Sequence, residues 1–291
     1  SRGPNAKVLK ACICAPEGHT LIEADSAQIE ARVLAWLAGE TGLVSAFENG
    51  EDVYKKMAAA IYGVRENEVS KQQRFIGKTT ILGCGYGMGA VKFRNQLKGM
   101  GVEVSEEECQ IIVRAYRSTH RNITTLWRRA QDVLMGLYQG YSNPLGRQGV
   151  LTVEAVNQAI RLPSNLLMRY DTLEATQGEK GPQFTYKTRR GRINIYGGKV
   201  VENVCQAIAR CVMAEQMLRI SKKYRVLLTV HDSVICCVSD EEVDVAAAYV
   251  AECMQWTPDW AAGLPLTGDV DTGKNYGECT AWVNPLGPLA V

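Results

Sequence analysis

Residues 21–32 read LIEADSAQIEAR, a short half-apolar segment that is followed almost at once by a helical pattern. Residues 21–24 have the character of a buried strand. Four apolar residues then recur at the spacing of one helix face: Ile29, Val33, Leu34 and Leu37. Asp25 is therefore expected at a strand end, where a rigid element can hold its carboxylate towards a ligand. Taken alone, Asp25 is better explained as the N-cap of the helix, and a functional role requires a second carboxylate and a basic partner.

Length and composition predict an ordered globular chain. A chain of 291 residues, 46% of them hydrophobic, can bury a substantial core and is expected to form two subdomains. No apolar run approaches the ~20 residues that span a bilayer. The chain starts with Ser-Arg-Gly-Pro, without Met, so we expect a fragment of a larger protein. Its ten cysteines lack any C-x-x-C pair, which favours buried thiols in a reducing compartment over disulfides or zinc.

The net charge of +2 conceals basic segments that indicate binding of a polyanion. Residues 70–102 and 109–131 contain no acidic residue, and a third basic cluster lies within residues 187–192. One such run is usually a solvated helix face, whereas three, balanced by acidic segments elsewhere, favour polyanion-binding surfaces.

The spacing within residues 70–82 predicts a helix with a functional face. Arg74, Lys78 and Leu82 recur every four residues and share one side of that helix, and Tyr86 continues the spacing. Alternate glycines over residues 83–89 then predict a flexible turn. Two cations one turn apart, beside an aromatic ring and a hinge, suit a polyphosphate clamp. A solvated basic face would have the same spacing.

The remaining segments are mostly helical. Helices are expected over residues 50–62, 105–118 and 123–138, whereas residues 141–198 are rich in turn signals and are expected to be irregular with short strands, and mobile over 176–182. Residues 199–224 predict a long helix. Its polar side, which can meet a nucleic-acid backbone or groove, carries Lys199, Asn203, Gln206 and Arg210.

Residues 226–238, VLLTVHDSVICCV, predict a β-hairpin with His231, Asp232 and Ser233 at its tip. Asp is common in turns, so Asp232 alone has a purely structural explanation. If the hairpin joins the strand that carries Asp25, two carboxylates meet at neighbouring strand ends. Such a pair would repel unless cations lay between them, and Mg²⁺ suits carboxylates and substrate phosphates.

These stretches, taken in order, resemble the three polymerase motifs of the family A DNA polymerases, in particular phage-type members. LIEADSAQIEARVLAWLAGE resembles motif A, RFIGKTTILGCGYG resembles motif B and VHDS resembles motif C. Any one motif is weak, but the ordered set is specific, and the resemblance covers nearly the whole chain.

The resemblance implies an α+β right-hand fold. Residues 1–39 and 196–291 would form a palm with an antiparallel sheet, and residues 40–195 would form mostly helical fingers. The thumb and exonuclease domain precede motif A in this family, so we expect both to be absent from this chain. A missing segment or a processivity partner would then supply the grip on DNA. No membrane association is expected, and the location implied is the cytoplasm of a bacterium or a phage-infected cell.

The resemblance also implies a reaction, namely the addition of dNTPs to a primer on template DNA. Asp25 and Asp232, with the backbone carbonyl of Ser26, would hold two Mg²⁺ ions. Lys78 would protonate the leaving pyrophosphate, and Glu30 would exclude a 2′-hydroxyl. The other residues implied in dNTP binding are Arg74, Lys78, Leu82, Tyr86, Gln28 and Tyr54. Those implied in DNA binding are Gln206, Asn203, Arg210, Lys199 and His231.

Three positions depart from the family pattern. Leu82 stands where the family generally has Phe or Tyr, Ser233 replaces the usual Glu after His-Asp, and Tyr54 stands where many members have a phosphate-binding His. Two alternative functions stay open. A single-subunit RNA polymerase also commonly carries His-Asp-Ser, although Glu30 argues against a ribonucleotide enzyme. A non-catalytic nucleic-acid-binding remnant is the second alternative.

Overall fold

The computed structural model describes residues 6–178 and 181–285, which form helices and antiparallel sheets in two compact units. We call residues 1–29, 210–262 and 266–291 the sheet unit, and residues 30–209 and 263–265 the helical unit. The chain divides at the start of helix α2 and within helix α9, not at the ends of the predicted palm and fingers. The assignment of palm and fingers therefore stays a prediction.

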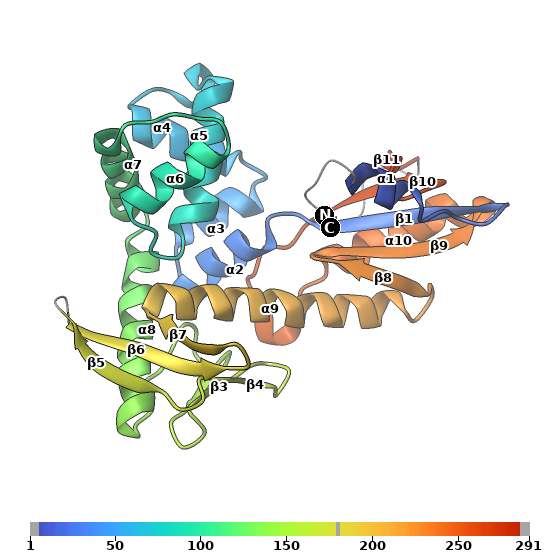
Figure 1. Ribbon diagram of the computed structural model, residues 1–291. Coiled ribbons are helices and arrows are strands. Elements are labelled where there is room, and N and C mark those ends of the chain that lie inside the picture. Colours follow the sequence, from blue (N-terminus) through green and yellow to red (C-terminus); the bar gives the residue numbers. More distant parts are fainter. Residues whose placement is uncertain (1–5, 179–180, 286–291) are drawn as a thin grey trace. The chain divides into compact units, whose positions relative to one another are not determined.

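Strand β1 (His19–Ser26) lies at the centre of the sheet unit. In the described residues it belongs to a five-stranded sheet of order β11-β10-β1-β9-β8, with antiparallel neighbours (Figure 1). The other strands are β8 (Val226–Val230), β9 (Ser233–Ser239), β10 (Gly268–Gly273) and β11 (Thr280–Ala281). Because β1 is paired along both edges, its register is fixed from two sides.

The two faces of this sheet differ in chemistry. Ile22 and Ala24 point to one face and are buried, and helix α10 (Val243–Gln255) packs against β1, β9 and β10 with its apolar side. Glu23 and Asp25 alternate with them and point to the other face. The remaining helical segments wholly within this unit are α1 (Ala6–Ala11), η2 (Asp240–Glu242) and η3 (Asp259–Ala261).

The helical unit is built from consecutive helices whose starts follow local sequence signals. Asp52 caps α4 (Val53–Tyr62), Ser70 and Gln73 form a capping box at α5 (Lys71–Cys84), and Ser105 caps α7 (Glu106–Thr119). Helices α4 and α5 pack closely because Gly77 carries no side chain where α5 crosses the backbone of α4. The other helical elements are α2 (Ile29–Ala38), α3 (Thr41–Glu48), η1 (Glu66–Glu68), α6 (Ala90–Gly99) and α8 (Arg121–Gln139).

Residues 141–198 are more regular than expected. They contain two small antiparallel sheets, one of β2 (Thr152–Glu154), β3 (Ala159–Arg161) and β4 (Leu167–Arg169), the other of β5 (Glu174–Gly178), β6 (Gly181–Thr188) and β7 (Gly191–Ile195). Most of the segment expected to be mobile lies in paired strands, and residues 179 and 180 lie outside the described residues. The short strands were expected, but the expectation of an otherwise irregular segment was wrong, because single turn residues did not reveal that consecutive strands pair into two small sheets.

Helix α9 (Gly197–Ile220) follows, where residues 199–224 were expected to be helical. Its predicted apolar side is buried at Val201, Val204, Ile208, Val212 and Met213. Within the described part of the chain, no helix combines the length and the apolar character needed to cross a membrane.

Candidate active site

The sheet unit brings Asp25 and Asp232 to neighbouring strand ends. Asp25 is the second-last residue of β1 and pairs with Ser233, the first residue of β9. Residues 231 and 232 form the short loop between β8 and β9, and the Ser26 amide donates a hydrogen bond to the Asp232 carbonyl at 3.0 Å. Helix α2 begins only at Ile29, so Asp25 is not its N-cap. The predicted meeting of the two strand ends is therefore present.

Ser233 holds the Asp25 carboxylate directly. Its hydroxyl donates a hydrogen bond to Asp25 Oδ1 at 2.7 Å. Burial raises the pKa of Asp25, this hydroxyl opposes the rise, and the negative charge of Asp232 adds to it. A half-buried carboxylate beside a second one is a group that a cation would stabilise in its charged form.

A divalent cation fits the chemistry of these donors. Asp25, Asp232 and the backbone carbonyl of Ser26 offer the oxygen ligands that Mg²⁺ prefers. Over residues 6–178 and 181–285, no group of three or more His, Cys, Asp or Glu side chains is arranged to hold a metal ion. Further ligands would therefore have to be water and substrate phosphates, as is usual for Mg²⁺ in nucleotide-binding sites.

In the helical unit, α5 presents the predicted cationic face. Arg74 Nε donates to Asp52 Oδ2 at 2.7 Å. The Tyr54 ring lies beneath both cations, with its centroid 5.4 Å from the Arg74 Cζ and 5.7 Å from the Lys78 Nζ. Tyr54 is only 5% exposed, so its ring serves as the floor of the basic face.

Leu82 and Tyr86 continue this side of α5 in different environments. Leu82 is 42% exposed. Tyr86 follows the helix and is half-buried, and burial, with smaller contributions from Cys205 and Glu30, raises the pKa of its hydroxyl. Glu30, in the first turn of α2, is therefore close to Tyr86. Gln28 has a positive φ of 57°, which is uncommon for a residue other than glycine.

The residues predicted to contact DNA differ in their exposure and in the partners that they have within the protein. On α9, Lys199 Nζ is paired with Glu202 at 2.8 Å, and Asn203 Nδ2 donates to the Tyr170 hydroxyl at 3.4 Å. Gln206 and Arg210 are exposed further along the same helix, and His231 is exposed in the β8–β9 loop with a φ of 56°.

The basic runs are partly neutralised within the chain. Arg94 pairs with Glu106 at 3.3 Å, and Arg192 pairs with Glu174 at 3.1 Å. Charge counts along the sequence therefore overstate the positive charge available to a polyanion.

Several groups that shape these sites were missed from the sequence. Asp52 is 22 positions from Arg74, and no local pattern connects them. The hydrogen bond from Ser233 to Asp25 follows from strand register, which the sequence did not specify. Glu23 did carry a signal, since a residue two positions before Asp25 on a strand must share its face.

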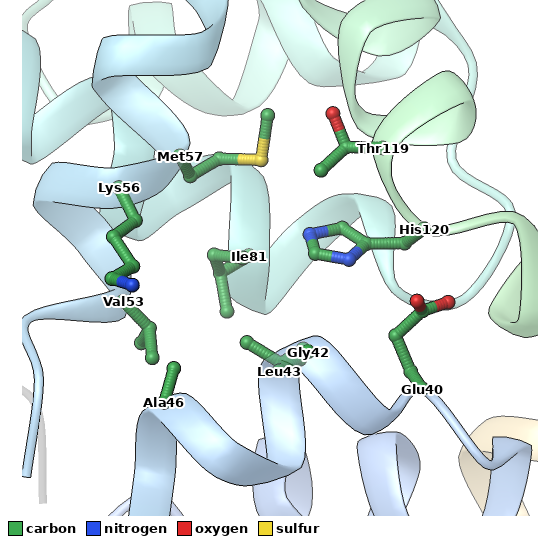
Figure 2. Close-up of a pocket in the computed structure, with 10 residues that line it drawn as sticks. All are labelled: Glu40, Gly42, Leu43, Ala46, Val53, Lys56, Met57, Ile81, Thr119 and His120. Atoms are coloured by element: carbon green, nitrogen blue, oxygen red, sulfur yellow. The ribbon is translucent and has the colours of Figure 1, made fainter. Parts of the chain in front are cut away.

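A separate pocket of about 180 Å³ lies within the helical unit, and Figure 2 shows the His120 ring pointing into it. Most of its lining is apolar, and Glu40 and Lys56 are its charged residues. His120 is 7% exposed, and burial lowers the pKa of its imidazole to about 4. His120 is thus neutral at pH 7.

Comparison with known proteins decides the family. The model of DNA polymerase family A matches residues 1–278. The chain belongs to DNA polymerase family A.

The relatives within family A include phage and bacterial enzymes. The DNA polymerase of Bacillus phage SP02 is 30% identical over 280 residues, which cover 91% of this chain and 42% of that protein. DNA polymerase I of Chloroflexus aurantiacus is 24% identical over 291 residues, which cover 100% of this chain and 27% of that protein. The chain thus spans less than half the length of these relatives.

A solved structure has the same fold. It is the POL domain of Pol1 from M. smegmatis in complex with DNA primer-template and dNTP, with a TM-score of 0.64 and 21% identity. The match covers 96% of this chain and 44% of that one. The α+β class and the right-hand polymerase fold expected from the motifs are confirmed.

Proposed function

We propose that this chain carries the polymerising site of a template-directed DNA polymerase, which extends a primer 3′-hydroxyl with deoxynucleotides and releases pyrophosphate. The observation that carries the proposal is the meeting of Asp25 and Asp232 at adjacent strand ends, with Ser233 bonded to Asp25 at 2.7 Å. Membership of family A, and the DNA primer-template and dNTP in the complex of the M. smegmatis structure, support DNA and dNTPs as the partners.

Asp25 and Asp232 would hold two Mg²⁺ ions, together with the Ser26 carbonyl. When bound, Mg²⁺ would neutralise phosphate charge and favour ionisation of the primer 3′-hydroxyl. The two carboxylates would keep their positions because Asp25 lies on β1 and Asp232 directly precedes β9, its neighbour in the same sheet. Phosphoryl transfer depends chiefly on such positioning and on charge neutralisation.

Arg74 and Lys78 would bind the triphosphate of the incoming dNTP. Asp52 orients the Arg74 guanidinium, and the Tyr54 ring supports both cations from below. Lys78 would donate a proton to the leaving pyrophosphate. Tyr86 would pack near the new base pair, with Glu30 beside it as the group that excludes a 2′-hydroxyl.

The other assignments follow the same proposal. Gln28 and Leu82 would contact the nucleotide, and Gln206, Asn203, Arg210, Lys199 and His231 would contact the primer-template. Residues 1–39 and 196–291 would act as the palm, and residues 40–195 as the fingers.

The test is primer extension on a defined template with Mg²⁺, using the full-length protein and its Asp232→Ala variant. We expect extension by the parent and a loss of at least about 10³-fold in the variant, because one of two metal-binding carboxylates is removed. Equal extension by parent and variant would refute the assignment of Asp232.

The same assay separates the two alternatives. Incorporation of rNTPs at rates equal to those of dNTPs would identify an RNA polymerase and refute the role of Glu30. DNA binding that weakens with salt, without Mg²⁺-dependent extension, would identify a non-catalytic binding protein.

A further inference from the structure

Glu23 shares a sheet face with Asp25. The two residues are separated by one position on β1, and their cross-strand neighbours on β9 are Ile235 and Ser233. Beyond Glu23, the same face continues as a buried apolar cluster of Leu21, Ile235 and Tyr276. The Glu23 carboxylate thus lies between this cluster and the Asp25–Asp232 pair.

The Ser233 hydroxyl lies on the face that carries these two carboxylates. It donates to Asp25, and Ser233 is the diagonal neighbour of Glu23 on the same face of the β1–β9 pair and only 6% exposed. A hydroxyl carries a single proton, so it can donate to one carboxylate at a time. The 2.7 Å contact shows that Asp25 Oδ1 receives it. Oδ2 of Asp25 is therefore the oxygen better placed to bind a cation.

Glu23 has partners of its own on this face. Burial raises the pKa of its carboxyl group, and the Lys10 ammonium and the Tyr276 hydroxyl oppose that rise. The Lys10 Nζ lies 4.2 Å from the centroid of the Tyr276 ring. Glu23 thus lies diagonally across from Ser233 on one sheet face, where a longer side chain at position 233 would have to share the space.

We propose that Ser233 and Glu23 form one coupled unit that positions Asp25, with Ser233 fixing one carboxylate oxygen and Glu23 supplying the negative charge that an acidic residue at position 233 would otherwise bring. This inference rests on the proposed function, because it concerns how the Asp25 carboxylate is oriented towards a bound cation. Both are positioning residues. With Glu23 supplying this charge, the chain can carry Ser at position 233, where the family usually has Glu.

The first test is Mn²⁺ affinity, measured by titration calorimetry on the full-length protein without DNA or nucleotide. We expect Ser233→Ala to weaken binding about tenfold, as loss of a group that orients a metal ligand usually does, and Ser233→Thr to stay close to the parent. Ser239→Ala is the matched control, because Ser239 also lies on β9 and donates to a carboxylate, that of Glu242, at 3.1 Å. The control is expected to leave Mn²⁺ affinity unchanged.

The second test exchanges the charge between the two positions. Ser233→Glu alone would place a third carboxylate beside Asp25 and Glu23, and Glu23→Ala alone would remove one. Glu23→Ala is expected to lower Mn²⁺ affinity several-fold because it removes negative charge, and adding Ser233→Glu to that variant is expected to raise the affinity again. In the parent, Ser233→Glu is expected to bring no such gain, because Glu23 already supplies the charge. Thermal unfolding in a chelator should show the same compensation, with Ser233→Glu lowering the midpoint by about 2–4 °C and Glu23→Ala relieving it.

Additive effects of the two substitutions, or an unchanged Mn²⁺ affinity in Ser233→Ala, would overturn the inference. In the extension assay, Ser233→Ala should raise the Mg²⁺ concentration needed for half-maximal rate and leave KM for dNTP unchanged, whereas a partial loss of folding would lower the rate by the same factor at every Mg²⁺ concentration. Failure of this inference can be distinguished from failure of the proposed function. If Asp232→Ala abolishes extension but residues 23 and 233 behave additively, the inference alone fails. If the parent neither binds Mn²⁺ nor extends a primer, the proposed function itself fails.

Discussion

One carboxylate, that of Asp52, both caps helix α4 and orients Arg74. Its Oδ1 accepts hydrogen bonds from the Tyr54 and Lys55 amides at 3.1 Å, while its Oδ2 accepts one from Arg74 Nε at 2.7 Å. Burial raises the pKa of Asp52, but the hydrogen bond from Arg74 and those from the amides outweigh it, and the net pKa is lowered. The start of α4 and the direction of the guanidinium on α5 are thereby coupled.

The two roles of Asp52 can be separated by substitution. Asp52→Asn keeps a good N-cap but loses the charge that holds Arg74, so KM for dNTP should rise about three- to tenfold with little change in stability. Asp52→Ala should raise KM similarly and also lower the free energy of unfolding by about 1 kcal/mol. Steady-state kinetics and urea unfolding measure the two effects. A KM unchanged in both variants would contradict a role of Arg74 in nucleotide binding.

The Tyr54 ring predicts a second, smaller effect on nucleotide binding. Tyr54→Leu removes the aromatic floor beneath Arg74 and Lys78, and KM for dNTP should rise about two- to fivefold. Tyr54→Phe keeps the ring and should remain within about twofold of the parent. Equal KM values for Leu and Phe at this position, in variants that unfold at the same temperature, would show that the ring does not act on the cations.

Substitution of Gly77 is expected to cause a large loss of stability at the crossing of α4 and α5. A Cβ at this position would lie 2.1 Å from the Tyr54 carbonyl oxygen, so Gly77→Ala must push α4 and α5 apart. We expect a loss of about 3 kcal/mol in the free energy of unfolding, at the upper end of overpacking costs. Gly99→Ala is the control, because nothing lies within 4 Å of its Cβ position in α6, and it should be neutral or stabilising. Equal stabilities of the two variants would contradict the close crossing.

Because His120 is buried as a neutral group, we expect the free energy of unfolding to fall as the pH falls. Its pKa is lowered to about 4 from an ordinary 6.5, so below pH 6.5 the unfolded chain takes up a proton that the folded chain does not. This contribution is fully present above pH 6.5 and is lost as the pH falls towards 4. Between pH 7.5 and 5.0 it amounts to about 2 kcal/mol.

The measurement is urea unfolding of the parent and of His120→Phe at both pH values. The variant keeps an aromatic ring beside Tyr116, whose centroid lies 4.8 Å from that of His120, but it cannot titrate. The parent should lose about 2 kcal/mol more than the variant. Equal losses would mean that His120 is not buried as a neutral group.

Much of the fold and part of the site followed from local pattern. The short half-apolar segment of residues 21–24 and the hairpin at residues 226–238 predicted two strand ends with carboxylates, and the structure pairs them. The four-residue spacing in α5 predicted its cationic face. The roles of these residues stay predictions, because the type and position of a residue do not by themselves show which reaction it takes part in.

The features that escaped prediction depend on contacts between distant segments. The bond between Asp52 and Arg74 and the ring of Tyr54 beneath the cations arise from the crossing of α4 and α5 at Gly77, which two separate helical patterns do not encode. The sheet of β5, β6 and β7 is a separate case: its consecutive strands pair locally, but their sequences lack strong alternation. Ser233 is directed to Asp25 by the register of β9 against β1.

The short loop of His231 and Asp232 makes this region intolerant of changes in length. Ser233 faces Asp25 because β9 begins directly after that loop, and Val234 points to the opposite side of the sheet. One inserted residue that shifted β9 along β1 would bring Val234 beside Asp25 and turn the serine away. In a library of single-codon insertions and deletions, the codons for residues 230–233 should therefore be among the least permissive, even though many substitutions at neighbouring exposed positions survive.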